Sequence, residues 1–249
     1  GRIAGITEYL SKPFTADKLL VIIERLLAEF KLRREKDAMR LYMSDAAVEH
    51  ATDMAKTGAS KKMRAKDAFM TILFTDIKGF TTMCESMTPQ EVVTLLNDYF
   101  DVMVNILKSN DAVVDKFIGD AIMALFSRDN KGAYQAVKSG MEMMRALKDF
   151  NEKHARELHM RCGINSGNVV MGDLGSKYHR RDFTVLGDNV NLAQRMESNA
   201  PVDGVLISNS TYLLVKDVVR VETPEPIKVK GKAEKIHCHI VKELMPAEF

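Results

Sequence analysis

The sequence predicts an α+β domain preceded by a helical segment, and three observations support this class. Apolar runs of strand length, such as residues 70–75, alternate with segments whose apolar residues recur every three or four positions. Hydrophobic residues make up 46% and charged residues 28% of the 249 residues, which is ordinary globular composition. Glu24 and Arg25 interrupt the most apolar stretch, so no bilayer-spanning segment is predicted.

Charge and cysteine content exclude several classes of protein. The formal charge of +2 is too small to indicate nucleic acid or an anionic membrane as the main partner. The three cysteines are odd in number and scattered, which argues against a disulfide framework and a zinc site. No signal peptide is visible, and we expect a protein of the reducing cytoplasm.

The first thirty residues predict a short strand at 6–10 and a helix with Thr15 as its N-cap. With the Lys12-Pro13 step between them, they resemble the last strand and helix of a two-component receiver domain. We interpret residues 1–30 as the remnant of such a domain, whose missing part would act as a regulator. The alternative interpretation is that these residues form a strand and an amphipathic helix that do not derive from a receiver domain.

Residues 31–69 predict a helical linker, since they are polar and poor in Gly and Pro until Gly58. Leu32, Met39 and Ala46 fall seven positions apart, which permits a short two-helix coiled coil. A plain linker helix explains the same pattern. The basic residues near position 62 are interpreted as a solvated face of this linker.

Residues 70–249 predict the main domain, with strands and helices in alternation. The succession fits a ferredoxin-like βαββαβ core with added strands. The expected elements are a strand at 70–76, a helix at 88–108, a hairpin at 113–126, a helix at 131–150, a strand at 158–165, a glycine-rich turn region at 163–175, a helix at 189–198, a strand at 204–208 and a closing segment at 227–242.

Two aspartates lie in the most informative motifs. Asp76 ends the apolar run at 70–75, and Asp120 lies in the Gly-Asp turn of the hairpin at 113–126. Carboxylates at strand ends can face each other across neighbouring strands and hold two hard cations. Both stretches closely resemble the metal-binding motifs of the class III nucleotidyl cyclases, and the resemblance covers roughly residues 70–241.

The resemblance implies a two-metal centre. Asp76, Asp120 and the backbone carbonyl of Ile77 would bind two Mg²⁺ ions, for which Mn²⁺ would substitute. Gly79, Phe80 and Thr81 would begin a helix whose amides face phosphate oxygens.

The resemblance also places the residues that select the base. Lys116 falls where the family discriminates purines, and an ammonium there can donate to adenine N1. Thr184 falls at the second discriminating position, where its hydroxyl can accept from the adenine amino group or donate to the guanine oxygen. Thr184 is therefore ambiguous, and ATP follows mainly from Lys116.

Three further residues correspond to catalytic or phosphate-binding positions of the family. Asn191 and Arg195 are four apart on one predicted helix, so their side chains share a face. In the family these positions orient the ribose and stabilise charge on the α-phosphate. Lys230 corresponds to the lysine that holds the β- and γ-phosphates.

The resemblance implies an adenylate cyclase that acts as a homodimer. One subunit would supply Asp76 and Asp120, and the other subunit would supply the remaining site residues. The ribose 3′-hydroxyl of ATP would attack the α-phosphorus in line and form 3′,5′-cyclic AMP and pyrophosphate. A guanylate cyclase and a catalytically silent nucleotide-binding signalling module remain as alternatives.

Overall fold

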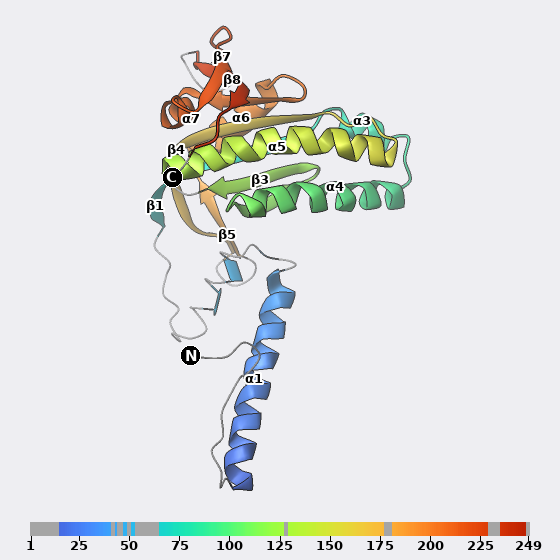
Figure 1. Ribbon diagram of the computed structural model, residues 1–249, viewed down its shortest axis with the longest axis vertical. Helices are drawn as coiled ribbons and strands as arrows, with labels where there is room; N and C mark the ends of the chain where they lie inside the picture. Colours follow the sequence, from blue (N-terminus) through green and yellow to red (C-terminus); the bar gives the residue numbers. More distant parts are fainter. Residues whose placement is uncertain are drawn as a thin grey trace. The chain divides into compact units, whose positions relative to one another are not determined.

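The computed structural model describes residues 15–40, 43, 47–48, 51–52, 65–126, 129–176, 181–228 and 235–247 (Figure 1). The chain divides into two compact units, residues 1–52 and 53–249. No helix in the described ranges is long and apolar enough to cross a membrane. The strand expected at 6–10, the Lys12-Pro13 step and Lys230 lie outside the described residues.

The first unit contains α1 (Ala16–Arg40), which begins where the sequence predicts. The Thr15 hydroxyl accepts from the amide of Lys18 at 3.4 Å, as an N-cap does. The helix continues without a break through residue 30, where the remnant and the linker were expected to meet. Large apolar side chains on α1, including Leu20 and Leu27, are exposed.

The second unit is built on one eight-stranded sheet with the order β2-β3-β1-β4-β6-β8-β7, in which β5 pairs with β4. Its first four strands have the ferredoxin-like order, so the α+β class is confirmed. The strands are β1 (Lys66–Ile77), β2 (Val113–Ile118), β3 (Ala121–Phe126), β4 (Met160–Gly175), β5 (Arg181–Leu186), β6 (Gly204–Ser208), β7 (Val219–Glu222) and β8 (Cys238–Leu244).

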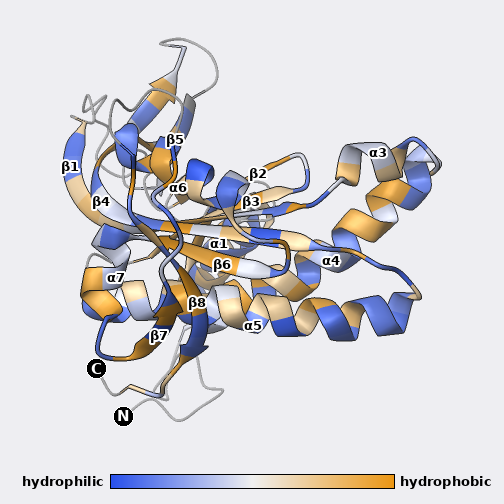
Figure 2. Ribbon diagram, turned by 90° about the horizontal axis from the view of Figure 1, so that it is seen from above, coloured by the Kyte–Doolittle hydropathy of each residue, from blue (hydrophilic) through white to orange (hydrophobic). Residues whose placement is uncertain are grey.

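Alternation along the central strands divides the core between the two faces of the sheet (Figure 2). On β1, Leu73 packs on one face, whereas Ile72 and Phe74 pack on the other. The first face is covered by α4 (Pro89–Ser109) and α5 (Asn130–His154). The second face contacts α6 (Asp188–Asn199), which packs against β4 and β1.

Local signals in the sequence set the start of α4. The Thr88 side chain accepts from the Glu91 amide at 3.3 Å, and the Glu91 carboxylate accepts from the Thr88 amide at 2.8 Å. This reciprocal pair is a capping box, and Pro89 occupies the first helical position. The expected helix at 88–108 is therefore confirmed, and so is the hairpin at 113–126.

The glycine-rich turn region expected at 163–175 is wrong. Those residues continue β4, which runs for 16 residues. A Cβ at Gly163 would lie 1.8 Å from the Glu197 amide nitrogen, and one at Gly167 would lie 2.4 Å from the Asn189 side chain. Glycine is therefore required at position 163, where the backbone of α6 approaches the strand, and at position 167 it leaves room for the Asn189 side chain of α6; neither glycine marks a turn.

The short helix α3 (Phe80–Cys84) follows β1 at the place where Gly79, Phe80 and Thr81 were expected to begin a helix. The structure also contains elements that the sequence did not indicate, among them the short helix α7 (Asn209–Val215), which follows β6. β7 was not expected, and β1 begins four residues before position 70. The closing segment contains β8, together with an isolated bridge between Ile227 and Ile236.

Candidate active site

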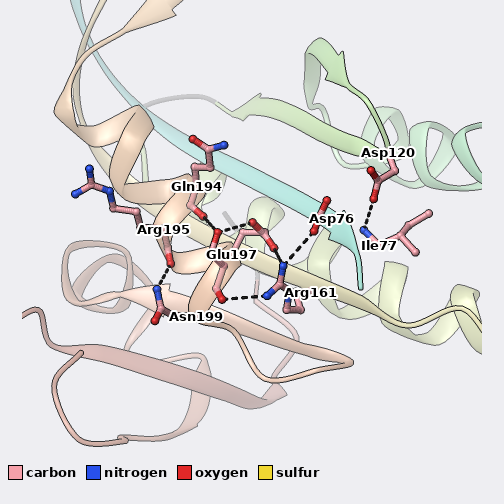
Figure 3. Close-up of polar contacts among 9 residues, drawn as sticks. Asp76, Ile77, Asp120, Arg161, Gln194, Arg195, Glu197 and Asn199 are labelled. Carbon is pink, nitrogen blue, oxygen red and sulfur yellow. Dashed lines mark hydrogen bonds and ion pairs between the residues drawn. The ribbon is translucent and has the colours of Figure 1, made fainter. Parts of the chain in front are cut away.

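Asp76, Ile77 and Asp120 lie together at one end of β1 (Figure 3). β1 pairs with β3 up to Thr75 opposite Ile122, which places the end of β1 beside the hairpin turn. The Ile77 amide donates to the Asp120 Oδ2 at 3.0 Å. The sequence prediction that these two motifs meet is therefore confirmed by the fold.

The two aspartates are electrostatically crowded. Burial raises the pKa of Asp120 to about 6, and the neighbouring Asp76 carboxylate contributes to the increase. Two like charges held this close disfavour each other's ionisation unless a cation lies between them. Hard carboxylate oxygens are also the donors that Mg²⁺ and Mn²⁺ prefer, so the residues present fit a divalent cation.

Arg161 is the functional candidate that sequence reasoning missed at this end. It lies on β4 directly opposite Asp76 in the antiparallel register. Its Nη2 lies 3.1 Å from the Asp76 Oδ2 and 2.9 Å from the Glu197 Oε1, and its Nη1 donates to the Ser198 carbonyl at 3.0 Å. We call Asp76, Ile77, Asp120, Arg161 and Glu197 the metal end.

Arg161 and Glu197 form a largely buried ion pair that orients Asp76. Their side chains are 18% and 7% exposed, and that of Asp76 is 30% exposed. Burial raises the pKa of Glu197, while the Arg161 charge acts in the opposite direction. Arg161 thus brings a positive charge directly to the Asp76 carboxylate.

The segment after β1 has the backbone form that the sequence predicts. Gly79 has φ of 75°, a left-handed conformation that glycine adopts without strain, and α3 begins at Phe80. The amide of Lys78 donates to the His159 carbonyl at 2.8 Å, which ties this turn to the start of β4. Phe80 and Thr81 therefore lie immediately beyond the metal end.

Lys116 and Thr184 meet although 68 positions separate them. The Lys116 Nζ donates to the Thr184 Oγ1 at 2.9 Å. Asp115 completes the group, because its Oδ2 accepts from the Thr184 hydroxyl at 2.9 Å and lies 3.2 Å from the Lys116 Nζ. We call Asp115, Lys116 and Thr184 the base end.

An irregularity in β2 lets two adjacent side chains reach Thr184. The pairing of β2 with β3 shifts between Val114 and Lys116, so Asp115 has no partner in the register. Such a bulge turns a side chain away from strict alternation. The side chain of Asp115 is 4% exposed, and sequence reasoning missed it although it is the direct neighbour of Lys116.

Asn191 and Arg195 both lie on α6, as predicted. Asn191 is exposed and Arg195 is half-buried. The Arg195 side chain points away from Asp76 in Figure 3. In the described part of the chain, no hydrogen bond or ion pair joins the metal end to the base end, to Asn191 or to the Arg195 side chain.

Comparison with known proteins identifies the domain that carries both ends. Residues 62–243 match the family model of the adenylate and guanylate cyclase catalytic domain. The chain belongs to this family. The cyclase domain is 38% identical over 191 residues to an adenylate cyclase of Anabaena cylindrica, a match that covers 70% of this chain and 36% of that protein. The chain thus spans about a third of the length of the relatives it matches first.

Solved structures agree with the cyclase fold. The adenylyl cyclase CyaB from P. aeruginosa superposes with a TM-score of 0.70 and 32% identity, covering 73% of this chain and 97% of that one. The guanylyl cyclase Cya2 superposes with a TM-score of 0.69 and 33% identity, covering 73% and 95%. One of these proteins is an adenylyl cyclase and the other is a guanylyl cyclase, so overall similarity does not indicate whether this chain uses ATP or GTP.

Proposed function

We propose that this cyclase domain converts ATP into 3′,5′-cyclic AMP and pyrophosphate. The observation that carries the proposal is the contact between Lys116 and Thr184, the two residues that correspond to the family's base-selecting positions. The Lys116 ammonium offers only donors, which suits adenine N1, an acceptor, and opposes the protonated N1 of guanine. The 38% identity to an adenylate cyclase of Anabaena cylindrica also supports ATP as the substrate.

The metal end would hold the two divalent cations. When bound, they would neutralise the triphosphate and lower the pKa of the ribose 3′-hydroxyl. Asp76, Asp120 and the Ile77 carbonyl would bind them, and Gly79, Phe80 and Thr81 would present backbone amides toward phosphate oxygens. Arg161 would keep Asp76 oriented and add positive charge on the phosphate side.

Two copies of the chain would share each active site. The Arg195 side chain points away from Asp76, and no hydrogen bond or ion pair among the described residues links it to the metal end, so one copy does not assemble all groups around one substrate. Apolar side chains beside the base end are about half exposed, namely Phe117, Ile118, Leu174 and Leu186. A second copy of the chain would cover such side chains. Asn191 and Arg195 of one copy would then act on the ATP held by the metal end of the other, with Lys230 on the terminal phosphates.

Product analysis tests this function directly. The chain is incubated with ATP or GTP, each with Mg²⁺ and with Mn²⁺, and the cyclic products are separated and quantified. Cyclic AMP in clear excess supports the proposal. No product from either nucleotide, from a chain shown to be dimeric, would instead favour a silent nucleotide-binding module.

Guanylate cyclase activity is the second candidate, and one observation favours it. The guanylyl cyclase Cya2 is as similar in fold and identity as the adenylyl cyclase CyaB. Cyclic GMP as the main product would overturn the assignment of the base and leave the two-metal reaction in place.

A further inference from the structure

The base end contains one residue that no family motif assigns to substrate selection. The Asp115 Oδ2 accepts a hydrogen bond from the Thr184 hydroxyl, with 2.9 Å between the two oxygens, and the Asp115 side chain is only 4% exposed. An ionised carboxylate offers only acceptors, and the Lys116 ammonium at 3.2 Å supplies its counter-charge. The direction of the hydrogen bond is therefore fixed, since the proton can come only from Thr184.

A count of donors and acceptors shows what this does to Thr184. A threonine hydroxyl has one proton and two lone pairs. The proton is committed to Asp115, and one lone pair accepts from the Lys116 Nζ at 2.9 Å. The one remaining function of the hydroxyl is to accept a further hydrogen bond.

The same count applies to Lys116. Its ammonium has three protons and no acceptor. One proton is donated to Thr184 and one faces Asp115, so a single proton is left for the base. The base end thus offers one acceptor, from Thr184, beside one donor, from Lys116.

Position 6 of a purine is where this pattern discriminates. Adenine carries an amino group there, which donates, whereas guanine carries an oxygen, which accepts. We propose that Asp115 is a positioning residue that turns the Thr184 hydroxyl into an obligatory acceptor and so makes the site select adenine over guanine. This inference rests on the proposed contact of Lys116 and Thr184 with the base.

The bulge in β2 is the structural device that makes this possible. In a regular strand, adjacent side chains point to opposite faces, so Asp115 and Lys116 would not both reach Thr184. The register shift between Val114 and Lys116 brings them to the same hydroxyl. Bulges beside active sites commonly re-aim a side chain in this way.

The test compares Asp115→Ala and Asp115→Asn with the unmodified chain. The readout is the ATP-to-GTP preference, both as kcat/KM and as the ratio of dissociation constants for α,β-methylene-ATP and α,β-methylene-GTP. Asp115→Ala frees the hydroxyl to donate to guanine, so the preference should fall about tenfold, the effect of one hydrogen bond. Asp115→Asn keeps an acceptor oxygen, so it should retain most of the preference.

Three results would overturn the inference. The first is an unchanged preference in a folded Asp115→Ala protein. The second is an equal loss in both variants, which would show that Asp115 acts only as a charge partner of Lys116. The third is a loss that persists when Asp115→Ala is made in a Thr184→Val background, where no hydroxyl remains to be oriented. Asp149→Ala, which removes an exposed carboxylate on α5, is the matched control and should change neither quantity.

Two features keep the test decisive. Binding of the methylene analogues does not need turnover, so a chain that makes no cyclic product still reports the preference, and failure of the proposed function is seen separately. If Asp115→Ala does not fold, the unmodified chain is tested with ATP and purine riboside triphosphate, which lacks any group at position 6. ATP should bind several-fold more tightly, and equal binding would contradict an acceptor at Thr184.

Discussion

The metal end and the base end of this cyclase domain differ in how their charges are balanced. At the metal end, burial raises the pKa of Asp120 and the neighbouring Asp76 carboxylate adds to the increase, although Arg161 pairs with Asp76 and Glu197. At the base end, the Asp115 carboxylate and the Lys116 ammonium are paired, and the Thr184 hydroxyl lies between them. Under the proposed function, bound cations would relieve the repulsion in the first region, whereas the charges of the second are already paired before a ligand binds. Changes at the first should therefore affect the rate, and changes at the second should affect the choice of nucleotide.

The largest effect is expected from removing a metal carboxylate. Asp76→Asn should lower turnover of ATP and GTP alike by at least about 10³-fold, because cation binding supplies several kcal/mol of charge stabilisation. Turnover with both nucleotides is measured beside gel filtration, which should show an unchanged dimer. A change in nucleotide preference instead of rate would contradict the division between the two ends.

Mixing variants tests whether the metal end of one copy acts together with Asn191 of a second copy. Asp76→Asn and Asn191→Ala should each be inactive alone. An equimolar mixture should recover about a quarter of the unmodified activity, because half of the dimers are mixed and each has one intact site. Absence of recovery, with mixed dimers demonstrated, would argue that each copy works alone.

The next largest effect is expected at Arg161. Arg161→Gln leaves Asp76 without its guanidinium and Glu197, which is 7% exposed, without its counter-charge. We expect a loss of about 10²-fold in turnover at unchanged ATP-to-GTP preference, since misplacement of a site group by about 1 Å has this cost. The free energy of unfolding should fall by about 3 kcal/mol, as for other broken buried pairs. Arg220→Gln breaks an exposed pair with Glu243 and is the matched control.

The sequence predicted the parts of each end that lie in contiguous motifs. Asp76 and Asp120 were expected together because each occupies a recognisable strand end, and the structure brings them together. Lys116 and Thr184 were each predicted as base-selecting residues from family positions, and the structure adds that they touch. Their roles toward a nucleotide stay predictions.

What the sequence could not supply was strand register. Arg161 is adjacent to Asp76 only because β1 and β4 pair in one particular alignment. Asp115 reaches Thr184 only because β2 contains a bulge, which alternation of residue types does not indicate. The same limit explains the error at Gly163, where glycine reflects the close approach of α6 and not a turn.

A smaller effect should appear in the stability of the metal-free protein. The raised pKa of Asp120, about 6, means that its ionised form opposes folding. That penalty is fully present above pH 6 and disappears as the pH falls toward the ordinary value for aspartate. Asp120→Asn should therefore stabilise the protein at pH 8 by on the order of 1 kcal/mol, a figure reduced for partial exposure. The gain should vanish near pH 4, as followed by thermal unfolding in chelator.

The smallest effect is expected from removing residues 1–64, which ends the deletion just before β1. No residue of α1 belongs to either end, so the rate of a formed dimer should stay within a few-fold of the unmodified rate. Exposed apolar residues of α1, such as Val21 and Leu27, are suited to contact a second copy. The deletion should therefore make activity fall earlier on dilution, because in the proposed function each active site forms only in the dimer. Identical activity and dilution profiles for both chains would show that residues 1–64 do not contribute to dimerisation.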